Sequence, residues 1–149
     1  MKRPMTDPLR LDQQLCFPLY AASNLLTRRY RPLLEALGLT YPQYLVMLVL
    51  WEDAPRTVGE LGRLLYLDSG TLTPLLKRLA AQGLIARQRA EEDERRVMIS
   101  LTPAGRALKQ RAVSVPEAML CQLSMTPAEF TTLRAQLQAL LATLAAPPG

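Results

Sequence analysis

Residues 67–101 carry the pattern that most limits the fold: a leucine-spaced segment followed at once by two stretches of alternating polarity. In LDSGTLTPLLKRLAAQG (67–83), Asp68 can cap a helix, and Gly83 stands where a helix-ending glycine is expected. The leucines between them recur at spacings of three or four: Leu72, Leu75, Leu76 and Leu79. LIARQRA (84–90) and RVMIS (96–100) then alternate as strands do, with the acidic turn EEDE between them. We therefore predict a helix over 69–82 and a β-hairpin directly after it.

Capping signals and prolines divide the rest of the chain into helices. TYPQ and TVGE both place a threonine three residues before a Gln or Glu, the pattern of a helix-opening capping box. Pro18 and Pro32 indicate kinks or junctions in the first helical region. The expected helices cover 12–37, 41–52, 58–65, a segment from 103 to Pro116, and a last one from 127 to about Ala146.

This order of elements predicts a mainly α fold with a small β hairpin. A helix pair followed immediately by a hairpin is the winged helix-turn-helix arrangement. Its second helix enters the major groove of DNA, and its hairpin reaches along the backbone or the minor groove. The helix over 69–82 is about 20 Å long at 1.5 Å per residue, enough to lie in a major groove.

Composition excludes several classes of function. The chain has 149 residues, a net charge of +5, two cysteines and no histidine. A structural zinc site needs four Cys or His ligands, and catalytic triads need a histidine, so no metal, cofactor or ordinary hydrolase chemistry is expected. The longest apolar run, 44–51, is too short to span a membrane, and no hydrophobic region follows the basic N-terminus. We expect one cytoplasmic domain with reduced thiols.

Polar and basic residues gather on the segment that is expected to meet DNA. Small polar groups open the helix at Ser69, Thr71 and Thr73, where they can contact bases or phosphates. Cations follow at Lys77, Arg78, Arg87 and Arg89, and the hairpin adds Arg95 and Arg96. The helix taken by itself could equally be a solvated amphipathic one. The arginines of the hairpin favour the DNA-binding interpretation.

Cys16 lies in an apolar, helical stretch, LDQQLCFPLYAASNLL, and admits two interpretations. A lone intracellular cysteine is most often a small buried hydrophobe. A peroxide sensor instead needs a thiolate that is stabilised by hydrogen-bond donors or positive charge. Tyrosines can donate such bonds without titrating near neutral pH, and Tyr20, Tyr30 and Tyr41 occur on the neighbouring helices.

The segments LDSGTLTPLLKRL, DERRV and ISLTPAG resemble the MarR family of winged-helix repressors, over residues 11 to about 145. LCFPLYAAS and GLTYPQYLVMLVLWE are similar to its organic hydroperoxide resistance regulators. The resemblance implies a homodimer with a DNA-binding lobe over 57–101 and dimerisation helices over 11–37 and 103–146. It makes 69–82 the recognition helix and Arg95 the minor-groove arginine of the wing, braced by Asp93.

The same resemblance assigns the redox residues. Cys16 occupies the position of the sensing cysteine, and Tyr30 and Tyr41 match the tyrosines that hydrogen-bond its sulfur. Cys121 takes the position of a resolving thiol that comes from the partner subunit, although its surroundings, PEAMLCQL, are not a specific motif and it could be core.

We therefore expect a transcriptional repressor that binds an inverted-repeat operator and leaves it when organic hydroperoxides oxidise Cys16. Two alternatives stay open at this point. One is a repressor of the same fold that phenolic or lipophilic ligands release without a covalent step, with Cys16 structural. The other is a thiol peroxidase that uses Cys16 for turnover, which the missing histidine argues against.

Overall fold

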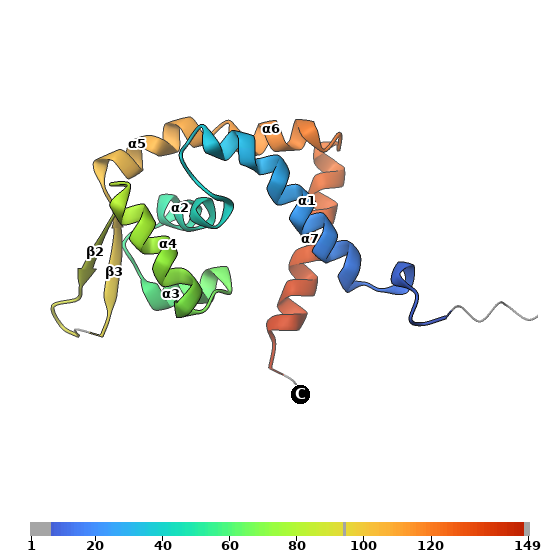
Figure 1. The fold of residues 1–149 in the computed structure, drawn as a ribbon, viewed down its shortest axis with the longest axis horizontal. Helices are drawn as coiled ribbons and strands as arrows, with labels where there is room; N and C mark the ends of the chain where they lie inside the picture. The colour runs from blue at the N-terminus through green and yellow to red at the C-terminus, as the bar shows by residue number, and fades with distance from the viewer. Residues whose placement is uncertain (1–6, 94, 148–149) are drawn as a thin grey trace, which may run out of the picture. The chain divides into compact units, whose positions relative to one another are not determined.

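The computed structural model describes residues 7–93 and 95–147, and it divides the chain into two compact units, Met1–Ala112 and Val113–Gly149. The first unit contains helices and a small sheet (Figure 1). Its elements are η1 (Leu11–Gln13), α1 (Cys16–Glu35), α2 (Tyr41–Glu52), β1 (Arg56–Thr57), α3 (Val58–Leu65), α4 (Ser69–Ala81), β2 (Ile85–Arg89), β3 (Val97–Leu101) and α5 (Pro103–Ala112).

The predicted caps open their helices. The Thr40 side chain accepts a hydrogen bond from the Gln43 N–H, and the Gln43 side chain accepts one from the Thr40 N–H, which completes the capping box of α2. Thr57 caps α3 by accepting from the Glu60 N–H. The predicted spans 41–52 and 58–65 are therefore confirmed.

The first helical region differs from the prediction. Residues 12–37 do not form one helix: a single 3₁₀ turn, η1, precedes α1, which begins at Cys16. Pro18 lies in the first turn of α1. A backbone N–H there would have no intrahelical partner, so the proline costs the helix no hydrogen bond. Cys16 therefore stands at a helix N-terminus and not inside a helix.

The sheet has one strand more than predicted. β2 and β3 pair antiparallel, with Arg87 opposite Ile99 and Arg89 opposite Val97. β1 adds to the other edge of β3, so that the strand order is β1-β3-β2. β1 is only two residues long, too short to show an alternating pattern in the sequence.

The core of the first unit lies between α1, α2, α3, α4 and the sheet. The predicted leucine stripe of α4 is buried there, and Ile99 of β3 is fully buried as well. The largest fully buried side chains are Leu34, Val46, Met47, Leu50, Leu61, Leu72, Leu76, Leu79 and Ile99. These side chains fix α4 to the rest of the unit through one face and leave its other face to solvent.

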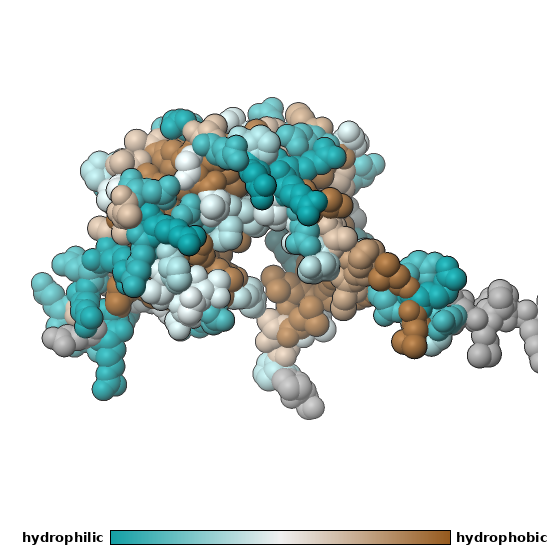
Figure 2. Space-filling view, in the orientation of Figure 1, coloured by the Kyte–Doolittle hydropathy of each residue, from teal (hydrophilic) through white to brown (hydrophobic). Residues whose placement is uncertain are grey.

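The second unit contains α6 (Val115–Gln122) and α7 (Pro127–Ala145). Thr126 and Glu129 form the capping box of α7, and the helix ends one residue before the predicted limit. α7 exposes a row of large apolar side chains (Figure 2): Leu133, Leu137, Leu141 and Leu144. Within the described residues, no helix combines the length and the apolar character that a membrane span needs.

Candidate DNA interface and redox site

The turn before α4 is held in a fixed conformation. Tyr66 ends α3 in the left-handed region at φ 56°, and the Leu67 N–H donates to the Gly62 carbonyl over 3.0 Å. The Asp68 carboxylate accepts the Thr71 N–H at 2.7 Å, and this hydrogen bond lowers the pKa of the Asp68 side chain. A capped, hydrogen-bonded corner thereby sets where α3 ends and where α4 begins.

The solvent face of α4 carries four of the five residues on this helix that were predicted to contact DNA. Ser69, Thr71, Lys77 and Arg78 are exposed, and Thr73 is half-buried. Pro74 lies inside the helix on the exposed side and has no N–H, so it cannot bond to the carbonyl of Gly70 four residues earlier. The exposed first turn therefore combines small hydroxyl groups with a carbonyl to which Pro74 cannot donate, while cations occupy the later turns.

The hairpin of β2 and β3 forms an exposed, hydrophilic projection (Figures 1 and 2). The Asp93 carboxylate accepts the backbone N–H of Arg95 at 3.0 Å, and the Arg96 N–H donates to the Asp93 carbonyl at 2.9 Å. Asp93 thus shapes the backbone of the turn that presents Arg95. Arg87, Arg89, Arg95 and Arg96 are all exposed, and Glu94, part of the predicted turn, lies outside the described residues.

An ion-pair network that the sequence did not reveal fixes the strand before α3. Arg56 contacts Asp53 at 3.2 Å and Glu60 at 3.5 Å, and its Nε donates to the Asp53 carbonyl at 3.1 Å. The network joins the end of α2 to the first turn of α3. Arg56 therefore holds the end of α2 and the start of α3 together, and it is not a free cation.

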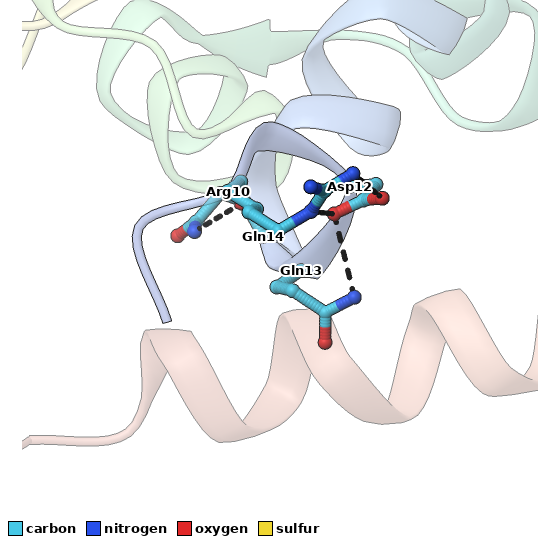
Figure 3. A network of polar contacts seen from close by, with 4 residues as sticks. All are labelled: Arg10, Asp12, Gln13 and Gln14. Atoms are coloured by element: carbon cyan, nitrogen blue, oxygen red, sulfur yellow. Dashed lines mark hydrogen bonds and ion pairs between the residues drawn. The ribbon is translucent and has the colours of Figure 1, made fainter. Parts of the chain in front are cut away.

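Cys16 is exposed as the first residue of α1. A polar network in the preceding segment sets the start of this helix (Figure 3). Arg10 binds both carboxylate oxygens of Asp12 at 3.1 Å, and this pairing lowers the pKa of the Asp12 side chain. Gln14 donates to the Pro8 and Arg10 carbonyls at 2.8 Å. Cys16 thus lies at the N-terminus of α1, where the first N–H groups of a helix have no intrahelical partner.

The predicted sensor tyrosines lie together, within an aromatic cluster. The rings of Tyr30 and Tyr41 have their centroids 5.0 Å apart, and Tyr44 lies 6.0 Å from Tyr30. Burial raises the pKa of all three phenols above the ordinary value of 10.0. The hydroxyl groups therefore stay protonated at neutral pH and can donate hydrogen bonds.

Cys16 and the tyrosine pair of one chain do not form one site. Tyr30 follows Cys16 by fourteen residues on the same helix, which at 1.5 Å per residue is about 21 Å along the axis. A tyrosine side chain cannot cover that distance. Cys121, on α6 of the second unit, is also exposed.

A helix-turn-helix whose second helix exposes hydroxyl groups and cations, beside a hairpin with four exposed arginines, defines a winged-helix DNA-binding protein. Residues 28–112 match the family described as transcriptional regulator SarA/Rot. The organic hydroperoxide resistance transcriptional regulator of Bacillus subtilis is 51% identical over 138 residues, 93% of this chain and 94% of that protein.

Solved structures agree with this match. Reduced AbfR bound to DNA has a TM-score of 0.79 and 38% identity, covering 93% of this chain and 96% of that one. AbfR, from Staphylococcus epidermidis, is also known in overoxidised and disulfide forms. MarR itself has a TM-score of 0.69 and 25% identity, covering 86% of this chain and 98% of that one. The chain belongs to the MarR family of winged-helix transcriptional regulators, in the group of the organic hydroperoxide resistance regulators.

Proposed function

We propose that the protein is a homodimeric repressor that leaves its operator when an organic hydroperoxide oxidises Cys16. The observation that carries this proposal is the separation of about 21 Å between Cys16 and Tyr30 on one helix. A second copy of the chain can bring its Tyr30–Tyr41 pair to the sulfur, so the dimer completes the site. The Bacillus subtilis relative, named for organic hydroperoxide resistance, and the oxidised forms of AbfR support it.

The chemistry begins at the thiolate of Cys16. Its sulfur attacks one oxygen of the hydroperoxide, the O–O bond breaks, and the leaving alkoxide takes up a proton to give an alcohol. The sulfur is oxidised to a sulfenic acid. A second thiolate then attacks that sulfur and displaces hydroxide, which is protonated to water, and a disulfide forms. We assign this second thiol to Cys121 of the partner subunit.

DNA binding follows from a pair of α4 helices in the dimer. Two recognition helices about 34–36 Å apart match an inverted repeat whose half-sites lie one helical turn apart. Ser69, Thr71 and Thr73 read the major groove, and the cations of α4 and the hairpin contact phosphates or the minor groove. Oxidation releases the operator by changing the spacing of the two α4 helices through the dimerisation helices.

The protein acts as a sensor and not as a peroxidase in this proposal. Turnover of peroxide would require each oxidised Cys16 to be reduced again for the next peroxide, whereas a sensor needs only one oxidation, and the exposed residues of α4 and the hairpin favour a DNA-binding role. A cytoplasmic location suits a sensor thiol, because glutathione and thioredoxin keep it reduced until peroxide arrives. Peroxide consumption beyond one equivalent per Cys16 would contradict the sensor role.

The test uses an operator fragment that the reduced protein selects from a random-sequence library. Cumene hydroperoxide should release wild-type protein from this fragment, and a reducing agent should restore binding if the product is a disulfide. The Cys16→Ser variant should bind the fragment as wild type does and stay bound after peroxide treatment. Release of Cys16→Ser by peroxide to the same extent as wild type would show that Cys16 is not the sensor.

The ligand-released alternative could use a hollow of about 270 Å³ beside Tyr41, or a second one of about 500 Å³ that Thr40, Gln43 and Arg78 help to line. Pockets for small molecules usually measure about 300–1,000 Å³ and enclose most of their ligand. The first hollow is smaller than this range, and the second is a shallow surface open to solvent. The exposed thiol and the tyrosine donors therefore favour the redox mechanism.

A further inference from the structure

The tyrosine cluster continues into a chain of contacts that ends at the hairpin. Tyr41 and Tyr44 have ring centroids 6.3 Å apart, and Tyr44 meets Trp51 edge-on at 6.5 Å and 67°. All three residues lie on α2. Tyr44 is only 3% exposed, so its ring cannot move without moving its neighbours. The cluster thus connects the predicted sensor tyrosines to Trp51 through close-packed rings.

Trp51 passes this connection to α5. Its indole Nε1 donates a hydrogen bond of 2.9 Å to the carbonyl of Gly105, in the first turn of α5. The Lys109 ammonium, one turn further along α5, donates to the Trp51 carbonyl at 3.5 Å. The end of α2 is therefore fixed to the start of α5 from two sides.

The start of α5 is in turn fixed to the hairpin. The Thr102 N–H donates to the Leu84 carbonyl at 3.1 Å, and the Thr102 hydroxyl donates to the Gly83 carbonyl at 2.6 Å. Gly105 packs so closely that an added Cβ would lie 2.0 Å from the Leu84 carbonyl oxygen. A displacement of Gly105 must therefore move the segment between α4 and β2.

We propose that Trp51 is a positioning residue that couples the redox state of the cysteine site to the hairpin and the end of α4. This inference rests on the proposed function and names a route within each subunit for its regulation. When oxidation removes the thiolate that the tyrosine hydroxyls bind, Tyr41 is released and the rings of α2 repack. Trp51 then transmits the shift through its hydrogen bond to Gly105. Coupling of this kind requires two discrete arrangements of a packed element, and α2 with α5 is that element.

The Trp51→Phe variant tests the route, because phenylalanine keeps an aromatic contact to Tyr44 and removes the N–H donor. The quantity to measure is the ratio of operator Kd for oxidised and reduced protein. Reduced Trp51→Phe should bind the operator within about threefold of wild type and should oxidise at Cys16 at the wild-type rate. Its Kd ratio should fall by at least about fivefold, the lower end of usual allosteric couplings.

The matched control is Gln82→Met. Gln82 Nε2 donates to the Gly38 carbonyl at 2.7 Å, so this change also removes one side-chain bond between distant segments of the same unit. The control should keep the wild-type Kd ratio even if it lowers the melting temperature as much as Trp51→Phe does. A merely structural Trp51 would lower stability without changing the ratio, and that result would overturn the proposal.

Two further measurements separate the inference from the function beneath it. Trp51 is the only tryptophan of the chain, so its fluorescence should change at the rate of Cys16 oxidation in wild type and stay constant in Cys16→Ser. In a double-mutant cycle, the combined variant Tyr41→Phe/Trp51→Phe should reduce the Kd ratio by less than the product of the reductions that the two single variants cause. If peroxide releases wild type and Trp51→Phe from the operator to the same extent, the proposed route through Trp51 is wrong, but the sensor function is unaffected. If wild type itself is not released, the proposed function fails first.

Discussion

The Tyr30 and Tyr41 rings lie 5.0 Å apart at an interplanar angle of 50°, which sets two phenols from different helices side by side. Desolvation raises the pKa of both phenols, and the neighbouring Tyr30 adds to the shift at Tyr41. Two phenols that stay protonated at neutral pH thus lie side by side on the first unit. In the proposed dimer, they would stabilise the partner's thiolate without carrying charge themselves.

The double variant Tyr30→Phe/Tyr41→Phe should slow oxidation of Cys16. A hydrogen bond to a charged acceptor contributes about 1.5–3 kcal/mol, so the loss of these donors should reduce the oxidation rate roughly ten- to hundredfold. Operator binding by the reduced variant should persist, because both rings remain. Rapid-mixing measurements of thiol loss with cumene hydroperoxide check the rate. Tyr66→Phe, at an exposed position, is the control. An unchanged oxidation rate in the double variant would show that Tyr30 and Tyr41 only pack in the core and do not bond to the sulfur.

Alkaline pH should destabilise the protein through the same cluster. The phenols of Tyr30, Tyr41 and Tyr44 have a pKa above 10.0 in the folded chain, and burial is the main cause. Their contribution to stability is complete below pH 10 and is lost as the pH rises through the raised values, since the unfolded chain loses these protons first. The absorbance of phenolate should show that these tyrosines lose their protons at higher pH than exposed tyrosines, together with unfolding of the chain. In a variant with phenylalanine at all three positions, this late phase should be missing.

Gly105→Ala should lower the free energy of unfolding by about 1–3 kcal/mol, the usual cost of overpacking. The new Cβ would lie 2.0 Å from the Leu84 carbonyl oxygen, a backbone atom that cannot rotate away. Gly59→Ala is the matched control, because a Cβ there meets its nearest atom at 3.9 Å. Urea denaturation should find the control as stable as wild type or slightly more stable. Equal stability of the two alanine variants would contradict the close contact.

The two kinds of DNA contact should separate in binding assays. Arg95→Ala should weaken binding most at operators with A·T-rich flanks, because a hairpin arginine reads a narrow minor groove. Lys77→Ala should weaken binding to every sequence and reduce the salt dependence by roughly one counterion. Arg134→Ala in α7 removes the same charge from a residue that lies over the Phe130 ring, and it should change neither property. Wild-type affinity of Arg95→Ala on A·T-rich flanks would show that Arg95 does not read the minor groove.

Local patterns explain how much of this fold could be predicted. Capping residues act within three positions of the sequence, so Thr40, Thr57, Asp68 and Thr126 identified their helices almost to the residue. β1 could not be found in this way, because two residues form a strand only through pairing with β3, some forty residues later in the chain.

Contacts that no sequence motif identifies account for what the site prediction missed. Trp51 and Gly105 are separated by 54 residues, and neither motif nor periodicity connects an indole with a distant backbone carbonyl. Arg56 pairs with Asp53 and Glu60 at spacings of three and four residues, which permit an ion pair but do not predict one. The recognition helix was predictable because the spacing of its leucines along the sequence identifies both its buried face and its exposed face. Cys16 was placed inside a helix, whereas it opens one, since the 3₁₀ turn before it depends on the side-chain bonds of Asp12 and Gln14.

The last prediction distinguishes sensing from resolution. In the proposed mechanism, Cys16 oxidises first, and Cys121 of the partner subunit then attacks the sulfenic acid to form a disulfide between subunits. Cys121→Ser should therefore still oxidise at Cys16, give no covalent dimer on a non-reducing gel, and proceed to sulfinic and sulfonic forms at excess peroxide. Intact-mass measurements follow these forms as additions of oxygen. If Cys121→Ser instead forms the covalent dimer as wild type does, the bond joins other atoms. If it resists overoxidation without a dimer, a small external thiol resolves Cys16, and the exposed Cys121 has another role.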